Sequence, residues 1–252
     1  MRAGSLEACG CFPTGRHYPG IAHVLRAVTR GLMQELDAEA AWADLPIALL
    51  DVETTGRDAS VDRVVEVGIA IARGGEVVER KNWLVNPGRP IPQEASDVHK
   101  ITDDAVKNAP LFEAVAREIV SALAGCVPAA YNAAFDRAFL GSELARAGLS
   151  TEGLPPALKK DIEWVDPLVW ARELQQGEKS RALADVAARL GVALENAHRA
   201  MDDAEAALRV LLALGRDVRV PRTYAAFIRE QRRLAMDQAD ERRLKWRAPP
   251  AT

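Results

Sequence analysis

Apolar and polar positions in the middle of the chain follow a pattern that predicts a hairpin meander. Residues 47–56 open as a short apolar run, which is typical of a strand buried on both faces. Residues 63–72 and 76–85 are two further β-rich runs, and the Arg73-Gly-Gly75 sequence between them is a hairpin signal. The three runs therefore predict consecutive antiparallel strands.

After residue 86 the pattern becomes helical, with short strands between the helices. A proline-rich loop comes first, and Thr102 followed by two aspartates indicates a helix start. Apolar spacing predicts helices over 111–123, 135–147, 168–174, 181–190 and 201–214, and short strands over 127–132 and 162–165. A meander followed by alternating helix and strand predicts an α/β domain, a mixed sheet of three antiparallel and then parallel strands flanked by helices.

Two segments flank this predicted domain, which spans residues 45–215. Residues 1–44 form an N-terminal extension: its first twenty residues are punctuated by glycine and proline, and residues 21–42 have the spacing of one amphipathic helix. Residues 216–252 form a basic C-terminal tail, with helical propensity over 224–246. The sequence does not decide whether the extension covers the core or docks a partner.

Composition indicates a globular protein outside the membrane. Hydrophobic residues make up 48% of the 252 residues and charged residues 27%. No apolar run approaches the roughly 20 residues of a membrane span, and the N-terminus has no signal-peptide core. Cys9, Cys11 and Cys126 form neither a disulfide framework nor a zinc site. We therefore expect a cytoplasmic protein that does not associate with a membrane.

Charge is unevenly distributed along the chain. Residues 216–247 hold ten basic and five acidic residues, a charge of +5, which leaves −8 for the remainder of a chain of net charge −3. An acidic centre with a basic flank is compatible with nucleic-acid binding. A solvated helix that packs on the domain through Tyr224, Phe227, Ile228 and Leu234 is the alternative for the tail. The tail arginines that could hold a nucleic-acid backbone are Arg219, Arg222, Arg229, Arg232, Arg233, Arg242 and Arg243.

Two acids stand near the end of the first predicted strand. Side chains alternate across a strand, so Asp51 and Glu53 leave by the same face. Two carboxylates on one face of a buried strand are costly unless a cation lies between them. A solvated, acidic strand end is the alternative for this pair considered by itself.

Further candidate residues lie at two helix starts. Asp136 follows a predicted strand and opens a helix, and Asp203 opens the last helix of the domain, five residues after His198. Ligands of sheet proteins collect at such strand ends and helix starts. Considered one by one, the acids could simply favour the helix dipole, and His198 could be a polar loop residue.

Together these residues resemble the motifs of the DEDDh (DnaQ-like) 3′–5′ exonuclease family, which includes the proofreading subunit of bacterial DNA polymerase III. The resemblance covers residues 46–215. Its motifs stand at Asp51-Val-Glu53-Thr-Thr-Gly56, at Asn132-Ala-Ala-Phe-Asp136 and from His198 to Asp203, with support from Val98-His99-Lys100-Ile101-Thr102 and Ser180-Arg-Ala-Leu183. Two positions depart from the family: Tyr131 stands where histidine is common, and Lys100 where glycine is common.

The resemblance implies a ribonuclease-H-like fold and a metal-dependent nuclease. Asp51, Glu53, Asp136 and Asp203 would bind two Mg²⁺ or Mn²⁺ ions, with Asp51 as the bridge. His198 would act as general base, because imidazole changes its charge near neutral pH. The residues expected to hold the terminal nucleotide are Thr54, Thr55, His99, Asn132 and Phe135.

The function expected from this resemblance is removal of nucleoside 5′-monophosphates from DNA 3′ ends, in proofreading or repair. Single-stranded DNA is the expected substrate, and a DNA polymerase subunit a candidate partner. Two alternatives stay open. One is an exoribonuclease that trims RNA or short oligonucleotides. The other is a non-catalytic polymerase-binding module, which loss of any of the five motif residues would have favoured.

Overall fold

A four-stranded mixed sheet forms the centre of the molecule. The structure is a computed structural model, and it describes residues 30–149 and 153–247. The strand order is β3-β2-β1-β4; β1, β2 and β3 are antiparallel neighbours, and β4 runs parallel to β1. The strands are β1 (Ile47–Thr54), β2 (Val64–Arg73), β3 (Glu76–Leu84) and β4 (Val127–Ala129). The predicted meander is confirmed.

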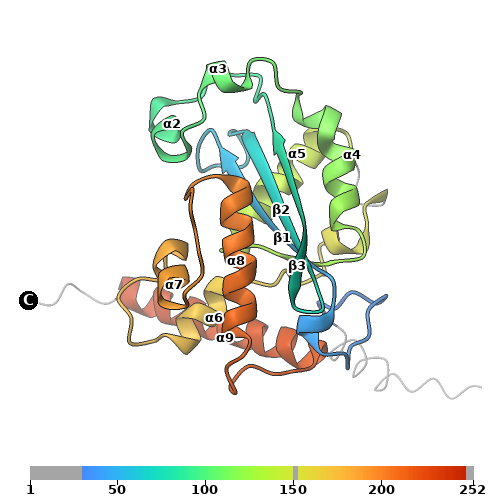
Figure 1. The fold of residues 1–252 in the computed structure, drawn as a ribbon, viewed down its shortest axis with the longest axis vertical. Helices are drawn as coiled ribbons and strands as arrows, with labels where there is room; N and C mark the ends of the chain where they lie inside the picture. Colours follow the sequence, from blue (N-terminus) through green and yellow to red (C-terminus); the bar gives the residue numbers. More distant parts are fainter. Residues whose placement is uncertain (1–29, 150–152, 248–252) are drawn as a thin grey trace, which may run out of the picture.

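Helices cover both faces of the sheet, so the fold has three layers (Figure 1). One face packs against α4 (Phe112–Leu123) and α5 (Ala133–Arg146). The other packs against α6 (Pro167–Leu174), α7 (Leu183–Arg189), α8 (Ala200–Leu214) and α9 (Tyr224–Arg247). The shorter helices are η1 (Trp42–Asp44), α2 (Gln93–His99), α3 (Asp103–Val106) and η3 (Pro156–Leu158). The predicted α/β class is therefore confirmed.

Strand alternation decides which way the acids of β1 point. Ile47 and Leu49 pack into the core on the α8 side, whereas Ala48 and Leu50 pack into the core on the α5 side. Asp51 and Glu53 continue the series of Ile47 and Leu49, so they face α8. Both are half-buried, in contrast to the fully buried apolar residues that precede them.

One local prediction over the middle of the chain was wrong. Residues 162–165 form no strand: Val165 makes a single parallel bridge to Ala129, because Asp166 at once becomes the N-cap of α6. Residues 93–99, for which the sequence analysis named no element, form α2. The proline-rich loop ends at Pro92, whose fixed φ of −58° suits the start of a helix.

The predicted helix over 21–42 does not extend through residues 30–42, and its first part lies outside the described residues. Residues 30–41 form turns instead, followed by η1. Their backbone pairs with the tail: the Trp42 N–H donates to the Arg222 carbonyl, and the Tyr224 N–H donates to the Ala40 carbonyl. Backbone groups that pair with another segment do not close helical turns.

The tail after residue 215 is part of the core. Phe227 of α9 stacks on Trp42, with ring centroids 4.4 Å apart, and on Trp170 of α6, at 4.8 Å. Tyr224, Ile228 and Leu234 are buried in the same cluster. The division of the chain at residues 44 and 215 stays a prediction. Within the described ranges, every helix is too short or too polar to cross a membrane.

Candidate active site

Three carboxylates meet between the end of β1 and the start of α8. Asp51 and Glu53 come from β1, and Asp203 comes from the first turn of α8. Each offers one oxygen atom, and the three atoms lie within 4.8 Å of one another. The Oδ1 atom of Asp203 is buried without a hydrogen-bond partner in the described part of the chain. These three are among the four acids of the motifs.

A glycine on β2 allows α8 to lie this close to the sheet. Gly68 stands opposite Asp51 in the β1–β2 register. A Cβ atom added to Gly68 would lie 2.3 Å from the carbonyl carbon and oxygen of Ala200, the first residue of α8. Only glycine permits this approach, so Gly68 determines how near Asp203 comes to Asp51. The sequence analysis missed this role.

Asp136 lies next to the group, in the first turn of α5. Its side chain is 3% exposed, and its Oδ1 accepts a hydrogen bond from the Val52 N–H at 3.1 Å. The carboxylate of Asp166 fixes the start of α5, because it accepts from the N–H groups of Asn132 (3.0 Å) and Ala133 (3.1 Å). Asp166 also caps α6 through the Leu168 N–H. The Asp-Pro pair at 166–167 was the sequence signal for this cap.

The four motif acids oppose one another's ionisation. Burial, followed by the charges of Asp136 and Glu53, raises the pKa of Asp51 well above its ordinary range. Burial and the charge of Asp203 raise the pKa of Glu53 to about 8. Burial also raises the pKa values of Asp136 and Asp203, although backbone N–H groups oppose the shift. Such a cluster is stabilised by bound cations.

His198 lies in the loop before α8, exposed to solvent. Its backbone has a φ of 68°, and its N–H donates to Asp203 Oδ2 at 3.2 Å. The geometry thus ties the histidine's backbone to one of the three grouped acids. The imidazole is left accessible to a substrate or to water.

A buried carboxylate that the sequence analysis missed holds this loop. Glu66, on β2 opposite Glu53, is fully buried and accepts from Arg199 Nη2 (2.7 Å), Arg199 Nε (3.1 Å) and the Ala200 N–H (3.1 Å). Asn82 adds a fourth hydrogen bond, at 2.9 Å. Burial alone would raise the pKa of Glu66, but these hydrogen bonds outweigh burial and lower it. The sequence signal was a single charge inside the apolar run of β2.

Left-handed backbone recurs in the motif segments. Lys100, Asn132 and His198 are the non-glycine residues with positive φ in the described ranges. Each lies in a segment that carried the resemblance. Lys100 ends α2 at φ 60°, which explains why glycine is common at this position in the family. Strained backbone of this kind clusters at functional sites.

The residues predicted to hold a nucleotide differ in how available they are. The Thr54 hydroxyl donates to the Gly56 carbonyl at 2.6 Å, and the Thr55 hydroxyl accepts from the Arg63 N–H at 3.0 Å, so both shape the loop after β1. His99 is 2% exposed, and its Nδ1 accepts from the Ile101 N–H. Asn132 is exposed, and the half-buried Phe135 ring lies 4.8 Å from that of Phe139.

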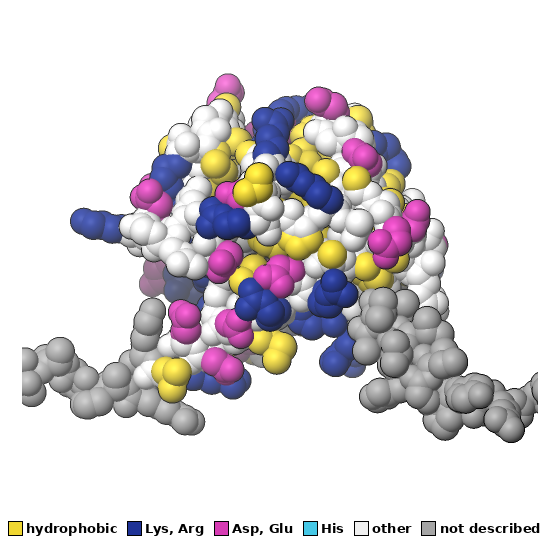
Figure 2. Space-filling view, turned by 90° about the horizontal axis from the view of Figure 1, so that it is seen from below, with side chains coloured by type: hydrophobic (Ala, Val, Ile, Leu, Met, Phe, Trp, Pro, Cys, Tyr) yellow, Lys and Arg dark blue, Asp and Glu magenta, His cyan; other side chains and the backbone are white. Residues whose placement is uncertain are grey.

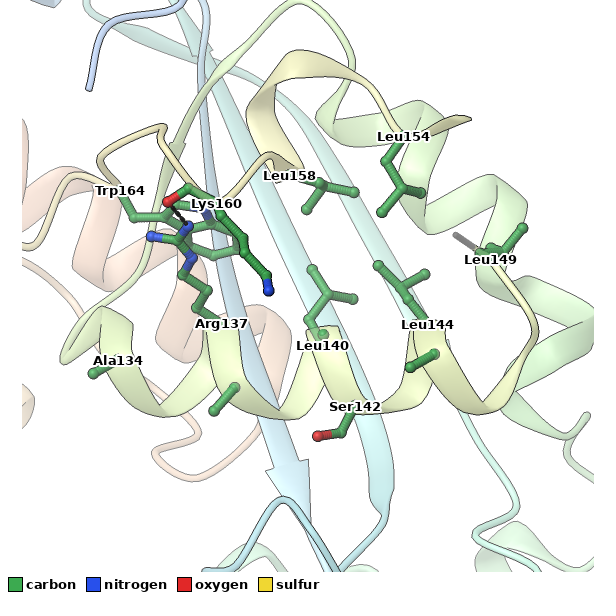
Figure 3. A pocket seen from close by; sticks show the side chains of 13 residues that line it. Ala134, Arg137, Leu140, Ser142, Leu144, Leu149, Leu154, Leu158, Lys160 and Trp164 are labelled. Carbon is green, nitrogen blue, oxygen red and sulfur yellow. Dashed lines mark hydrogen bonds between the residues drawn. The ribbon is translucent and has the colours of Figure 1, made fainter. Parts of the chain in front are cut away.

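A cavity of about 800 Å³ lies away from the acids, on the outer side of α5. Figure 3 shows Leu140 and Leu144 of α5 facing Leu154 and Leu158 across it. None of the four motif acids lines this apolar space. The cavity is therefore separate from the acid group at the end of β1.

Comparison with known proteins agrees with this site. The RNase_T family model, described as exonuclease, matches residues 49–211, so the chain belongs to this exonuclease family and is a nuclease. The matched residues include all five predicted catalytic positions. The resemblance to DEDDh exonucleases is confirmed.

Curated relatives include much longer polymerases. The chain is 32% identical over 181 residues to the PolC-type DNA polymerase III of Streptococcus suis, covering 72% of this chain and 12% of the relative. It is 30% identical over 194 residues to that of Thermotoga maritima, covering 77% of this chain and 14% of the relative. The chain therefore spans about an eighth of the length of these relatives.

Solved structures share the fold. Exonuclease X in complex with 5′ overhanging duplex DNA matches with a TM-score of 0.51 and 23% identity, over 67% of this chain and 90% of that chain. E. coli Exonuclease I in complex with a dT13 oligonucleotide matches at 0.58 and 19%, over 68% and 41%. The nuclease domain of 3′hExo, a DEDDh family member bound to rAMP, matches at 0.57 and 16%, over 69% and 92%.

The acid group fits the divalent metal ions that a DEDDh exonuclease implies. Its donors are carboxylate oxygens, the ligands that hard divalent cations prefer. The oxygens converge within 4.8 Å, one of the Asp203 oxygens has no partner among the described residues, and the acids raise one another's pKa values. A bound divalent cation would coordinate the converging oxygens, give the unpartnered Asp203 oxygen a partner and offset the repulsion between the carboxylates.

Proposed function

We propose that this protein is a 3′–5′ exonuclease that hydrolyses the terminal phosphodiester of DNA and releases nucleoside 5′-monophosphates. The observation that carries the proposal is the convergence of Asp51, Glu53 and Asp203, with Asp136 adjacent. These four residues would hold two Mg²⁺ or Mn²⁺ ions. Such ions supply an activated water and stabilise the leaving oxygen.

Each protein group has a part in this proposal. His198 is exposed, its backbone bonds to Asp203, and its imidazole would take a proton from the attacking water. Glu66 accepts hydrogen bonds from Arg199 and from the Ala200 N–H, and so holds the loop that carries His198. The exposed Asn132 and the half-buried Phe135 would contact the terminal nucleotide, and Phe135 offers a stacking face that any base can use.

DNA is the substrate that the comparisons favour. The curated relatives at 30–32% identity are DNA polymerases, and two of the structural matches are DNA complexes. This also supports a role in proofreading or repair and association with a polymerase. RNA is the second candidate, because the matching 3′hExo nuclease domain was solved with rAMP.

The test uses three 5′-labelled substrates of one sequence: single-stranded DNA, a duplex with a mismatched 3′ end, and RNA. With Mg²⁺ or Mn²⁺ we expect DNA products that shorten from the 3′ end, and no products in EDTA. Asp203→Asn should abolish cleavage, whereas Asp202→Asn, the same change one residue away and outside the acid group, should not. His198→Ala should lower turnover by roughly 10²–10⁴-fold. Faster shortening of RNA than of DNA would overturn the substrate assignment.

A further inference from the structure

Most arginines of the tail are already engaged within the protein. Figure 2 looks at the α9 side of the molecule, where Lys and Arg side chains alternate with Asp and Glu. Five of the seven tail arginines that could hold a nucleic-acid backbone have partners: Arg219 with Asp217, Arg222 with the Gly215 carbonyl, Arg232 with the Arg30 carbonyl, Arg233 with Glu230 and Asp237, and Arg243 with Asp240. The tail is therefore not a uniformly basic surface.

Arg242 differs from these five, because it lines a cavity together with a second arginine. Arg242 of α9 and Arg172 of α6 line one cavity of about 480 Å³. Within the described ranges neither side chain has a hydrogen-bond or ion-pair partner. Burial lowers the pKa of Arg172, and the nearby charge of Arg242 lowers it further. Two unpaired guanidinium groups in one cavity repel each other unless an anion joins them.

The other charged residues of the lining determine how much negative charge a bound group must carry to neutralise the cavity. Arg181 adds a third positive group, which its hydrogen bonds to the Gln175 and Gln176 carbonyls hold in place. Glu173 and Glu241 add two negative groups, and neither lies within ion-pair distance of Arg172 or Arg242 in the described structure. The net charge is +1. One phosphodiester, which carries a single negative charge, would neutralise it.

The cavity adjoins the segment that leads into the active site. The Tyr131 hydroxyl donates to the Arg181 carbonyl at 2.5 Å, and α5 begins two residues after Tyr131. The charge of Arg172 acts on both Tyr131 and Asp166, which caps α5. In Figure 1, α6 and α7 lie beside the C-terminal half of α9. Tyr131 therefore connects the start of α5, the helix that carries Asp136, to the lining of this cavity.

We propose that Arg172 and Arg242 bind one phosphodiester of the nucleic-acid strand, upstream of the 3′ end that is cleaved. This site rests on the proposed function, since it needs a nucleic-acid substrate. A guanidinium group suits this task because it can donate two parallel hydrogen bonds to the oxygens of one phosphate and because it stays charged.

The experiment measures binding of a labelled single-stranded oligonucleotide in EDTA over a range of KCl concentrations. Each phosphate contact contributes about 0.7 to the slope of log K against log salt for single strands. If each arginine contributes one such contact, the Arg172→Gln, Arg242→Gln double variant should lose about 1.4 from that slope and bind about 25-fold more weakly at 0.1 M salt. In the presence of metal, its KM for the oligonucleotide should rise while kcat is kept.

The control is the Arg233→Gln, Arg243→Gln double variant, which removes the same charge from paired arginines of α9. Its slope should stay close to that of the wild type. Equal slopes in both double variants would overturn the site, and so would an unchanged slope in the first. Absence of DNA cleavage by the wild type would instead refute the proposed exonuclease function. Failure of the phosphate site and failure of the proposed function are therefore distinguishable. Thermal melting of each variant verifies that it is folded.

Discussion

Gln231 of α9 binds the backbone of Asp166 and so connects the C-terminal helix to the active site. Its Oε1 accepts from the Asp166 N–H at 2.9 Å, and its Nε2 donates to the Trp164 carbonyl at 2.9 Å. The Gln231 side chain is 1% exposed. Asp166 in turn holds the two N–H groups at the start of α5, the helix that carries Asp136. Hydrogen bonds through Asp166 therefore connect α9 to the start of the helix that carries a predicted metal ligand.

Replacing Gln231 with leucine should destabilise the protein. The change leaves two buried backbone groups without partners, which costs about 2–5 kcal/mol in free energy of unfolding. Gln238→Leu is the matched control on the same helix, because Gln238 is half-buried and gives one hydrogen bond, to the Val169 carbonyl. It should cost about 1 kcal/mol. Urea denaturation measures both values, and equal losses would contradict the special place of Gln231.

Gly68→Ala should impair catalysis more than folding. The added methyl group meets the Ala200 backbone and pushes the start of α8, with Asp203, away from Asp51. A displacement of about 1 Å at a reacting centre costs roughly 100-fold in kcat/KM. Gly141→Ala, within α5, is the control: its Cβ meets nothing within 4 Å, so activity should be unchanged. If the folded Gly68→Ala variant keeps the kcat/KM of the wild type, the position of α8 does not limit catalysis.

Glu66→Gln should lower kcat by about tenfold or more, because the new amide opposes the N–H groups of Arg199 and Ala200 and loosens the loop that carries His198. The matched control is Glu143→Gln. Glu143 is also buried, and it also accepts from an arginine, Arg63, at 2.7 and 3.0 Å and from a backbone N–H at 3.2 Å. Both variants should lose stability, but only Glu66→Gln should lose kcat. Equal kcat in the two would reduce Glu66 to a structural role.

Stability of the metal-free protein should fall as the pH rises from 4.5 to 8. The Glu53 carboxyl keeps its proton up to about pH 8 in the folded state, whereas the unfolded chain releases it near the ordinary value of 4.5. Between these values the folded state binds more protons, so the free energy of unfolding decreases with pH. In EDTA the Tm should drop by at least about 3 °C, the effect of about 1 kcal/mol in a protein of this size.

Two controls accompany that measurement. Saturating Mg²⁺ should flatten the decline, because bound cations stabilise the ionised acids. Glu53→Gln should also reduce it, since the glutamine side chain has no proton to release. A Tm in EDTA that rises over the same range would mean that the acids are not held close together.

The sequence was sufficient for the three antiparallel strands and for the acid group. Period-two burial in β1 predicted that Asp51 and Glu53 share a face, and that face proves to be the one toward α8. The helix starts at Asp136 and Asp203 were also predictable, because acids favour these positions. Local patterns of this kind depend on a few neighbouring residues and are visible along the chain.

Contacts between distant segments were not predictable in the same way. Nothing in the local sequence shows that Glu66 meets Arg199, or that residues 38–42 pair with residues 222–225. The turns of residues 30–41 follow from that long-range pairing, which overrides helical spacing. The apolar residues Tyr224, Phe227, Ile228 and Leu234 did indicate that the tail helix packs on the domain, but they did not indicate which side chains it meets.

The place of α9 in the core has a consequence for biosynthesis. A ribosome makes the meander before helices α6 to α9, so Ile47 and Leu49 at first lack the apolar side chains of those helices. That cover is complete only after Leu234, 180 residues beyond the last residue of β1, has left the exit tunnel. Until then the nascent chain exposes part of an apolar face, the kind of surface that aggregates and to which chaperones bind during translation.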